Sequence, residues 1–322
     1  MSFRTELHLS PSGHPFDYGH RILAIGSCFV ENIGQRLIDG KFDGLLNPFG
    51  ISYNPIVLAR QLDYFSGRLE FPADDFFVHQ DEWHHFDLHG KWNDPDLAEI
   101  GKRLSSTIDR ASEQVQEADW LILTLGTAHV FHHLESDQIV NNCHRLPGQQ
   151  FERRLLSVSE MNTALSKSLE AILQVNPKIQ VILTVSPVRY LRDGLVDSQR
   201  SKAHLITAVH QLCEELDRVV YFPAYELLLD DLRDYRFFDR DLAHPSGEAI
   251  DYIWEQFRGV YFSPETEKIY LDILKFRKLL QHNVHGSAEA KQKFQAQVLG
   301  KLATLEQKYP MLDWEVERAG LG

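Results

Sequence analysis

Ile22-Leu23-Ala24-Ile25-Gly26-Ser27-Cys28-Phe29 is the stretch of sequence that decides the fold. A short apolar run, then Gly-Ser, then an amphipathic segment predicts a strand, a tight turn and a helix. Residues 30–39 continue with apolar side chains at helical spacing. The Ser27 hydroxyl is therefore expected at the carboxyl end of a buried strand, beside a helix N-terminus.

Three further apolar runs have the length and composition of buried strands: Trp120–Leu125, Val181–Val185 and Val219–Phe222. Helical periodicity or helix-capping residues are found near 55–65, 96–117, 157–173, 200–216 and 246–257. Strands that alternate with helices predict an α/β fold with a parallel sheet and helices on both faces. In such folds ligands bind at the carboxyl ends of the strands.

Two segments depart from this alternation. Residues 66–95 are rich in Phe, His, Asp and Trp and lack clear periodicity, so we expect an insertion that could cover the site. From residue 259 onward, the stretches 271–280 and 294–305 are helical, with charges between the apolar positions. The sequence therefore predicts a catalytic domain over 1–258 and a helical C-terminal extension over 259–322.

Composition limits the class of protein. The chain has 322 residues, 43% of them hydrophobic, and a net charge of −13, which disfavours nucleic acid or anionic membranes as partners. No stretch approaches the ~20 apolar residues of a membrane span, and the N-terminus lacks the pattern of a secretory signal. The three cysteines form no CxxC pair. We expect a cytoplasmic protein without a cofactor; its oligomeric state is not indicated.

Asp241 and His244 lie three residues apart near the end of the chain, and Pro245 favours a loop there. A serine needs a base to take its proton, and the base needs a carboxylate to orient its ring. Ser27, His244 and Asp241 therefore predict a Ser-His-Asp triad for a hydrolase or acyltransferase. The GxSxG motif of the other large serine-hydrolase class does not occur.

Two other kinds of chemistry remain open from the residues. Cys28 adjoins Ser27 and could be the nucleophile, because a thiol at a helix N-terminus can have a lowered pKa. Histidines cluster at 79–89 and 129–133 and could hold a metal, but no HExxH or paired acidic pattern accompanies them. Histidines and aromatic residues together would also suit sugar binding. We favour Ser27 as nucleophile and expect no metal.

Five ordered blocks carry a resemblance to a known family: Gly26–Val30, Asn47–Pro55, Leu125–Ala128, Asn142–His144 and Ser186–Arg189. Together they resemble the GSCFA family over roughly residues 20–258. That family resembles the SGNH/GDSL hydrolases, which implies a flavodoxin-like three-layer α/β/α fold and activity on acyl esters, often acetyl esters of carbohydrates. A small-molecule or carbohydrate ester is the substrate that the resemblance implies.

The resemblance also assigns roles. It implies Ser27 as nucleophile, His244 as base and Asp241 as acid. Backbone N–H groups of Ser27 and Gly50 would form the oxyanion hole. Gly126 and Thr127 match the start of the block that lines the substrate site.

The family's third block normally supplies an asparagine donor to the oxyanion, and here Ala128 stands at that position, followed by His129. Loss of one such donor typically costs ~2.7–4 kcal/mol of transition-state stabilisation. Our hypothesis is that Asn142 or His144 replaces it, with His129 as a second candidate. A structural role for His144 stays open, as does a catalytically degenerate protein that binds a carbohydrate or a partner.

Arg189 follows the third predicted strand. Its guanidinium could hold a substrate carboxylate or phosphate, or it could tie a loop acid such as Asp193 or Asp197. We favour the structural role. The sequence does not separate hydrolysis from acyl transfer, because both use the same triad.

Overall fold

The computed structural model describes residues 5–281 and 288–319. Its central sheet has five parallel strands in the order β10-β9-β5-β1-β2, which is the doubly wound, flavodoxin-like order. The strands are β1 (Arg21–Gly26), β2 (Asp43–Leu46), β5 (Trp120–Leu125), β9 (Gln180–Val185) and β10 (Val219–Phe222). The four strands predicted from apolar runs are confirmed. β2 escaped prediction because its four residues, DGLL, hold only two apolar side chains.

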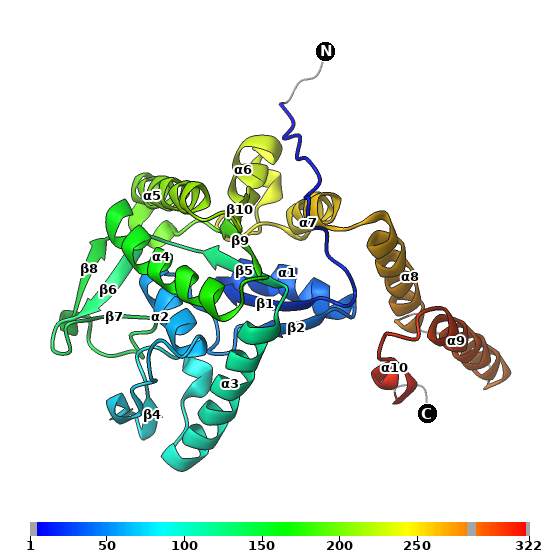
Figure 1. The fold of residues 1–322 in the computed structure, drawn as a ribbon, viewed down its shortest axis with the longest axis horizontal. Helices are drawn as coiled ribbons and strands as arrows, with labels where there is room; N and C mark the ends of the chain where they lie inside the picture. Colours follow the sequence, from blue (N-terminus) through cyan, green and yellow to red (C-terminus); the bar gives the residue numbers. More distant parts are fainter. Residues whose placement is uncertain (1–4, 282–287, 320–322) are drawn as a thin grey trace. The chain divides into compact units, whose positions relative to one another are not determined.

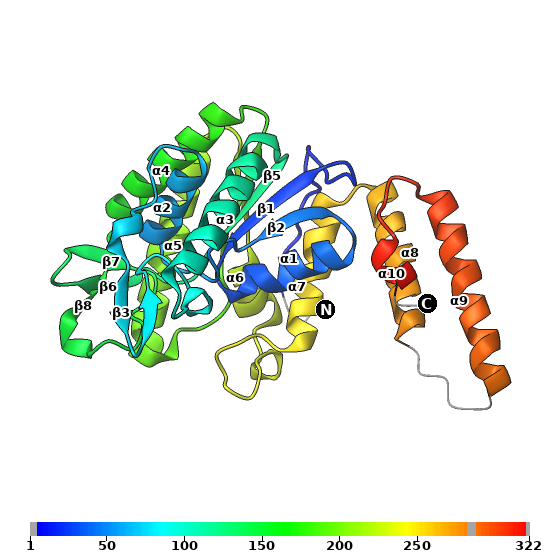
Figure 2. The same cartoon turned by 90° about the horizontal axis from the view of Figure 1, so that it is seen from below.

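Helices cover both faces of this sheet. They are α1 (Cys28–Asp39), α2 (Pro55–Phe65), α3 (Leu97–Glu117), α4 (Val158–Val175), α5 (Gly194–Glu215) and α7 (Gly247–Tyr261). Figures 1 and 2 show α2, α3, α4 and α5 on one side of the strands and α1 on the other. All six residues of β5 are buried, as are five of the six in β1 and β9, because a strand covered on both faces has no solvent side.

Local signals set several helix ends. Ser157 and Glu160 form the predicted capping box of α4, and Asn54 caps α2 directly before Pro55. α5 starts six residues before the predicted start at 200, and the two apolar residues of its first turn, Leu195 and Val196, are exposed rather than part of the buried face. Short turns complete the main unit: α6 (Ala224–Glu226), the π-helical η5 (Leu227–Leu232), and the 3-10 turns η1 (Ala73–Asp75), η2 (Gly90–Trp92), η3 (Gly148–Gln150), η4 (Leu191–Asp193) and η6 (Tyr235–Phe237).

Two small antiparallel sheets were not predicted. The 66–95 segment contains the hairpin of β3 (Phe77–His79) and β4 (Glu82–His84). The strands β6 (His129–His133), β7 (Gln138–Val140) and β8 (Phe151–Leu155) form a sheet in the order β7-β6-β8. Leu88 and Trp92 from the inserted segment belong to the main hydrophobic core. The inserted segment therefore contributes side chains to the main core.

The chain divides into two compact units. One holds residues 1–8, 21–35 and 44–254, and the other holds 9–20, 36–43 and 255–322. The second unit contains α8 (Pro264–Leu280), α9 (Ala288–Lys308) and α10 (Glu315–Ala319), whose core includes Ile273, Phe276 and Leu302. The predicted helical extension is present, and it shares its unit with two N-terminal segments. None of the described helices combines the length and apolar character needed to cross a membrane.

Candidate active site

Ser27 lies in the turn between β1 and α1, and close packing against β5 fixes that turn. Gly26 has φ +146°, and a Cβ there would lie 2.4 Å from the Thr124 carbonyl oxygen, so only glycine fits. The Gly26 N–H donates to Asn47 Oδ1 (2.8 Å), and the Ser27 N–H donates to Thr124 O (3.2 Å). Ser27 is only 4% exposed, and its Oγ accepts the Phe29 N–H (3.3 Å).

Asp241 and His244 are joined directly. His244 Nδ1 donates to Asp241 Oδ2 at 2.6 Å, while Asp241 Oδ1 accepts the backbone N–H groups of Ala243 (2.9 Å) and His244 (3.0 Å). The His244 backbone N–H, its ring and the Ala243 N–H together lower the pKa of Asp241 to about 2. Both side chains are about half exposed. The carboxylate therefore orients the ring and leaves Nε2 for another group.

The loop that carries this pair is attached to the end of β9. The Arg189 N–H donates to Ala243 O (2.9 Å), and the Arg189 guanidinium carbon lies 3.9 Å from the centre of the Phe238 ring. Ser27 occupies the same edge of the sheet, after β1. In the part of the chain that the structure describes, no hydrogen bond joins Ser27 Oγ to the His244 ring. The predicted acid and base are thus hydrogen-bonded to each other, and the predicted nucleophile, Ser27, lies at the same edge of the sheet without a hydrogen bond to the His244 ring among the described residues.

Gly50 follows β2 in a turn next to Ser27. Its φ is +87°, and a Cβ there would lie 2.4 Å from His89 Cβ, so glycine is required. The Gly50 N–H donates to Asn47 O at 2.8 Å. The backbone N–H groups proposed for the oxyanion hole, those of Gly50 and Ser27, thus both have carbonyl partners in this structure.

Asn142 reaches the turn that touches Gly50. Its Nδ2 lies 3.4 Å from where a Cβ would stand on Gly90, the neighbour of His89. Its Oδ1 accepts the His144 N–H (2.9 Å), whereas Nδ2 donates to no described residue. Among the predicted oxyanion donors, Asn142 Nδ2 is therefore uncommitted, and so is His129 Nε2, which is buried without a hydrogen-bond partner.

Residues 21–257, which include Ser27, Asp241 and His244, match the model of the GSCFA family. The chain belongs to the GSCFA family. The comparison with curated proteins gave no match.

Two solved structures resemble this GSCFA chain, each over 79% of it and 99% of their own length. One is a carbohydrate esterase family 3 protein from Talaromyces cellulolyticus, with a TM-score of 0.37 and 9% identity. The other is an acetyl esterase mutant with an acetate ion, with a TM-score of 0.37 and 11% identity. These values are too low for the neighbours' activities to be carried over.

Ala128, where an asparagine was expected, faces the interior of the GSCFA domain. It is fully buried in the main core, and its N–H donates to Ser201 Oγ (2.8 Å). The Thr127 hydroxyl lies 3.1 Å from the same Ser201 oxygen, and the Gly126 and Thr127 N–H groups both donate to Tyr53 O (2.8 and 3.2 Å). The backbone N–H groups and the Thr127 hydroxyl of this block thus form hydrogen bonds within the protein, to Tyr53 and Ser201.

His144 has no free ring nitrogen. Nε2 donates to the His85 carbonyl (2.9 Å) and Nδ1 lies 3.1 Å from His84 Nδ1. Burial lowers the pKa of His144 to about 4. Burial also lowers the pKa of His129, which starts β6. For His144 these contacts match the structural role left open by the sequence rather than substrate binding.

Cys28, the alternative nucleophile, has an environment that disfavours its reactive form. Burial, aided by Glu31, raises the pKa of the Cys28 thiol, which favours the thiol over the reactive thiolate.

Arg189 Nη1 is buried without a hydrogen-bond partner, and no ion pair joins Arg189 to Asp197 among the described residues. The Asp193 side chain lies outside the described part.

Lys202 is a residue that sequence reasoning missed. It lies on α5 and is 2% exposed, with its ammonium 2.6 Å from Gly126 O and 2.7 Å from Ser186 O. A signal was available: Ser198, Ser201 and Lys202 continue the apolar stripe of Leu205, Ala208, Val209 and Leu212 at helical spacing. Polar residues on the buried face of a helix indicate that polar groups of the protein interior lie opposite them and bind them.

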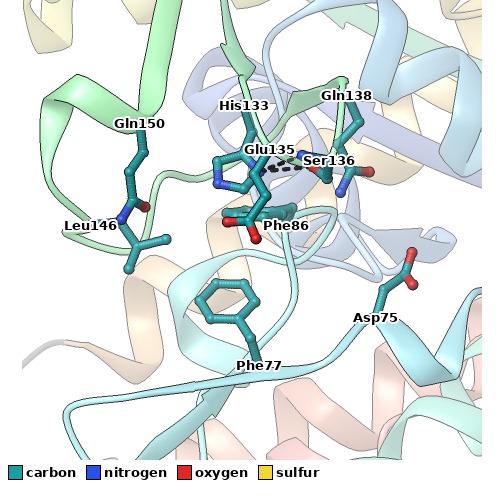
Figure 3. Close-up of a pocket in the computed structure, with 9 residues that line it drawn as sticks. All are labelled: Asp75, Phe77, Phe86, His133, Glu135, Ser136, Gln138, Leu146 and Gln150. Carbon is teal, nitrogen blue, oxygen red and sulfur yellow. Dashed lines mark hydrogen bonds between the residues drawn. The ribbon is translucent and has the colours of Figure 1, made fainter.

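A cavity of about 480 Å³ opens between the inserted hairpin and the β6–β7–β8 sheet (Figure 3). Its walls include the rings of Phe77 and Phe86 and the carboxylates of Asp75 and Glu135. None of the predicted catalytic residues lines it. Among the described residues, no group of three or more His, Cys, Asp or Glu side chains is arranged to hold a metal.

Proposed function

We propose that this GSCFA protein is a serine esterase or O-acyltransferase that acts on acyl esters, with acetyl esters of carbohydrates as the first substrates to test. Ser27 is the nucleophile, His244 the base and Asp241 the orienting acid. The observation that carries the proposal is the 2.6 Å bond between Asp241 Oδ2 and His244 Nδ1, at the sheet edge where Ser27 follows β1.

The proposed reaction has two steps. Ser27 Oγ attacks the acyl carbonyl while His244 Nε2 takes its proton, and His244 then gives the proton to the departing alcohol oxygen. Water or a second hydroxyl next attacks the acyl-enzyme, and Ser27 regains its proton through His244. Asp241 stays ionised throughout and stabilises the imidazolium, as its lowered pKa favours.

The nucleophile and the base have to meet for this mechanism. Ser27 is nearly buried, whereas the His244 side chain is 51% exposed. Catalytic hydrogen bonds are often long or unformed without substrate and tighten in the complex. We infer that the 239–246 loop closes over the Ser27 turn when an ester binds.

Oxyanion stabilisation is assigned first to Asn142. Its Nδ2 is uncommitted and lies at the turn beside Gly50. It would replace the asparagine that is absent at Ala128, whose side chain is buried in the core.

The test is labelling of the full chain with a fluorophosphonate, combined with hydrolysis of 4-nitrophenyl acetate and acetylated sugars. We expect label on Ser27 and turnover that is lost in Ser27→Ala and His244→Ala. Ser105→Ala, an exposed serine on α3, is the matched control and should behave as wild type. Turnover that survives in Ser27→Ala but is lost in Cys28→Ala would transfer the nucleophile to Cys28.

A second candidate function is a binding protein that has lost catalysis. The burial of Ser27 and the absence of a bond between it and His244 favour this candidate. An inert Ser27 in an otherwise folded protein, together with retained binding of acetylated sugars, would support it against the enzyme.

A further inference from the structure

Lys202 is a buried cation without an anion. Its side chain is 2% exposed, and no carboxylate among the described residues pairs with it. Lysine is almost never fully buried unless it is paired, because removal of an ammonium group from water costs several kcal/mol. A charge kept in this place therefore calls for an explanation beyond packing.

The ammonium lies at the edge of the sheet that carries the proposed active site. Gly126 directly follows β5 and Ser186 directly follows β9, and Lys202 bonds both carbonyls. β5 also holds the Ser27 turn through Thr124 O. Electrostatic interaction links Lys202 to Cys28, the residue next to Ser27.

Hydrogen bonds from α5 to the loops after β5 and β9 do not require a charged side chain. On the same face of α5, Ser201 binds the loop after β5, and Ser198 accepts the Tyr190 N–H from the loop after β9 (3.2 Å). These hydroxyls tie the loops at a lower desolvation cost than an ammonium. Lys202 has three N–H donors, and the third has no acceptor among the described residues.

We propose that Lys202 is an electrostatic positioning residue of the acyl-transfer site: it fixes the loops after β5 and β9 and turns a positive charge toward the Ser27 turn, where the oxyanion forms. This proposal rests on the proposed function. It accounts for a site in which the N–H groups of Ser27 and Gly50 are committed to carbonyls and the expected asparagine is Ala128.

The charge state of Lys202 gives the proposal a pH signature. Burial lowers the pKa of Lys202 to about 7, and the Cys28 interaction opposes this only in part. The titratable groups that face it are Cys28 from α1 and Tyr225 from α6, whose ring centre lies 5.7 Å from the ammonium. Burial raises the pKa of both groups, so both stay neutral near pH 7. Lys202 therefore loses its charge as the pH rises through about 7.

The experiment compares Lys202→Met, Lys202→Arg and wild type, with the exposed Lys167→Met on α4 as control. Values of kcat and KM for 4-nitrophenyl acetate are measured from pH 5.5 to 9, beside the rate of fluorophosphonate labelling and the Tm. For wild type we expect kcat to fall as the pH rises above about 7, where Lys202 loses its charge.

Lys202→Met should lower kcat about 100-fold with little change in KM, and it should lack the alkaline fall. Lys202→Arg should recover part of kcat and also lack the alkaline fall, because arginine keeps its charge. An unchanged kcat and pH profile in folded Lys202→Met would overturn the proposal.

Should Lys202→Met not fold, the wild-type profile decides: an alkaline fall near pH 7 supports the charge, and a flat alkaline side rejects it. If wild type neither turns over esters nor labels at Ser27, the esterase function fails and the role of Lys202 fails with it. If wild type is active but lacks the alkaline fall in kcat, and Lys202→Met leaves kcat unchanged, the esterase function is retained and the role proposed for Lys202 is rejected.

Discussion

His244 Nδ1 donates to Asp241 Oδ2 at 2.6 Å, and the same carboxylate accepts two backbone N–H groups from its own loop. The sequence spacing of three residues allowed this bond. The loop's fold makes it, since Leu242 between them adopts a left-handed φ of +57° that turns the chain back on itself.

Asp241→Asn should therefore lower kcat for ester hydrolysis by about 10²–10⁴-fold with a folded protein. The amide cannot stabilise the imidazolium and would favour the wrong tautomer of His244. The measurement is kcat for 4-nitrophenyl acetate, with the exposed Asp109→Asn on α3 as control. Equal turnover in Asp241→Asn and the control would remove Asp241 from the triad.

Asn142→Asp should lower kcat by about 10²–10³-fold. This change keeps the Oδ1 acceptor for the His144 N–H and removes the Nδ2 donor, so the turn is retained while the oxyanion contact is lost. Asn142→Ala should lose most hydrolysis as well. Near-normal turnover in Asn142→Asp, checked against its Tm, would show that Asn142 is not the donor.

His144 should govern part of the acid sensitivity of the fold. Its pKa is about 4 in the folded protein against 6.5 for an unperturbed histidine, so the unfolded chain binds more protons between these values. The free energy of unfolding should fall as the pH drops from 6.5 to 4, and this slope should be smaller in His144→Gln. Urea unfolding at several pH values measures it.

The same variant tests whether His144 contacts substrate. Both ring nitrogens face protein groups, so kcat and KM of folded His144→Gln at pH 7.5 should match wild type. A raised KM with an unchanged acid slope would restore the substrate-binding role considered from the sequence.

Gly26→Ala should destabilise the fold by about 2–3 kcal/mol, since its Cβ would lie 2.4 Å from Thr124 O. The matched control is Gly101→Ala on α3, where a Cβ meets nothing within 4 Å. That change should stabilise by about 0.5–1 kcal/mol through helix propensity. Equal effects of the two changes in urea unfolding would contradict the packing of the Ser27 turn against β5.

Prediction from the sequence was strongest for elements buried on both sides. The runs that became β1, β5 and β9 are nearly continuous in apolar residues, which is the pattern that burial on both faces imposes. β10 lies at the edge of the sheet with Val220 exposed, and its four residues, VVYF, were still recognisable as an apolar run. The antiparallel strands β6, β7 and β8 mix His, Arg, Glu and Gln with apolar residues. No continuous apolar run or clear periodicity therefore indicated these strands in the sequence.

The candidate site residues also differ in how far apart in the chain their contacts lie. The Asp241–His244 pair is local, and spacing alone was enough to propose it. Lys202 and Asn142 reach the site through contacts with residues at least 16 and 52 positions away in the chain, namely Ser186 and Gly90. Helical spacing on α5 indicates that Lys202 is on the buried face, but it does not indicate which groups Lys202 meets, because those contacts depend on how β9, α5 and the inserted segment pack.

By itself the sequence determined the α/β class, through the alternation of apolar runs and helical periodicity along the chain. It also determined the turn that holds Ser27 and the close spacing of Asp241 and His244, since both follow from residue types within about ten positions. Only the tertiary structure decided that Ala128 is buried in the core, that the Gly50 N–H is already bonded, and that Lys202 lies beneath the loops after β5 and β9. The physical reason is that burial and hydrogen-bond partnership are properties of the packed chain.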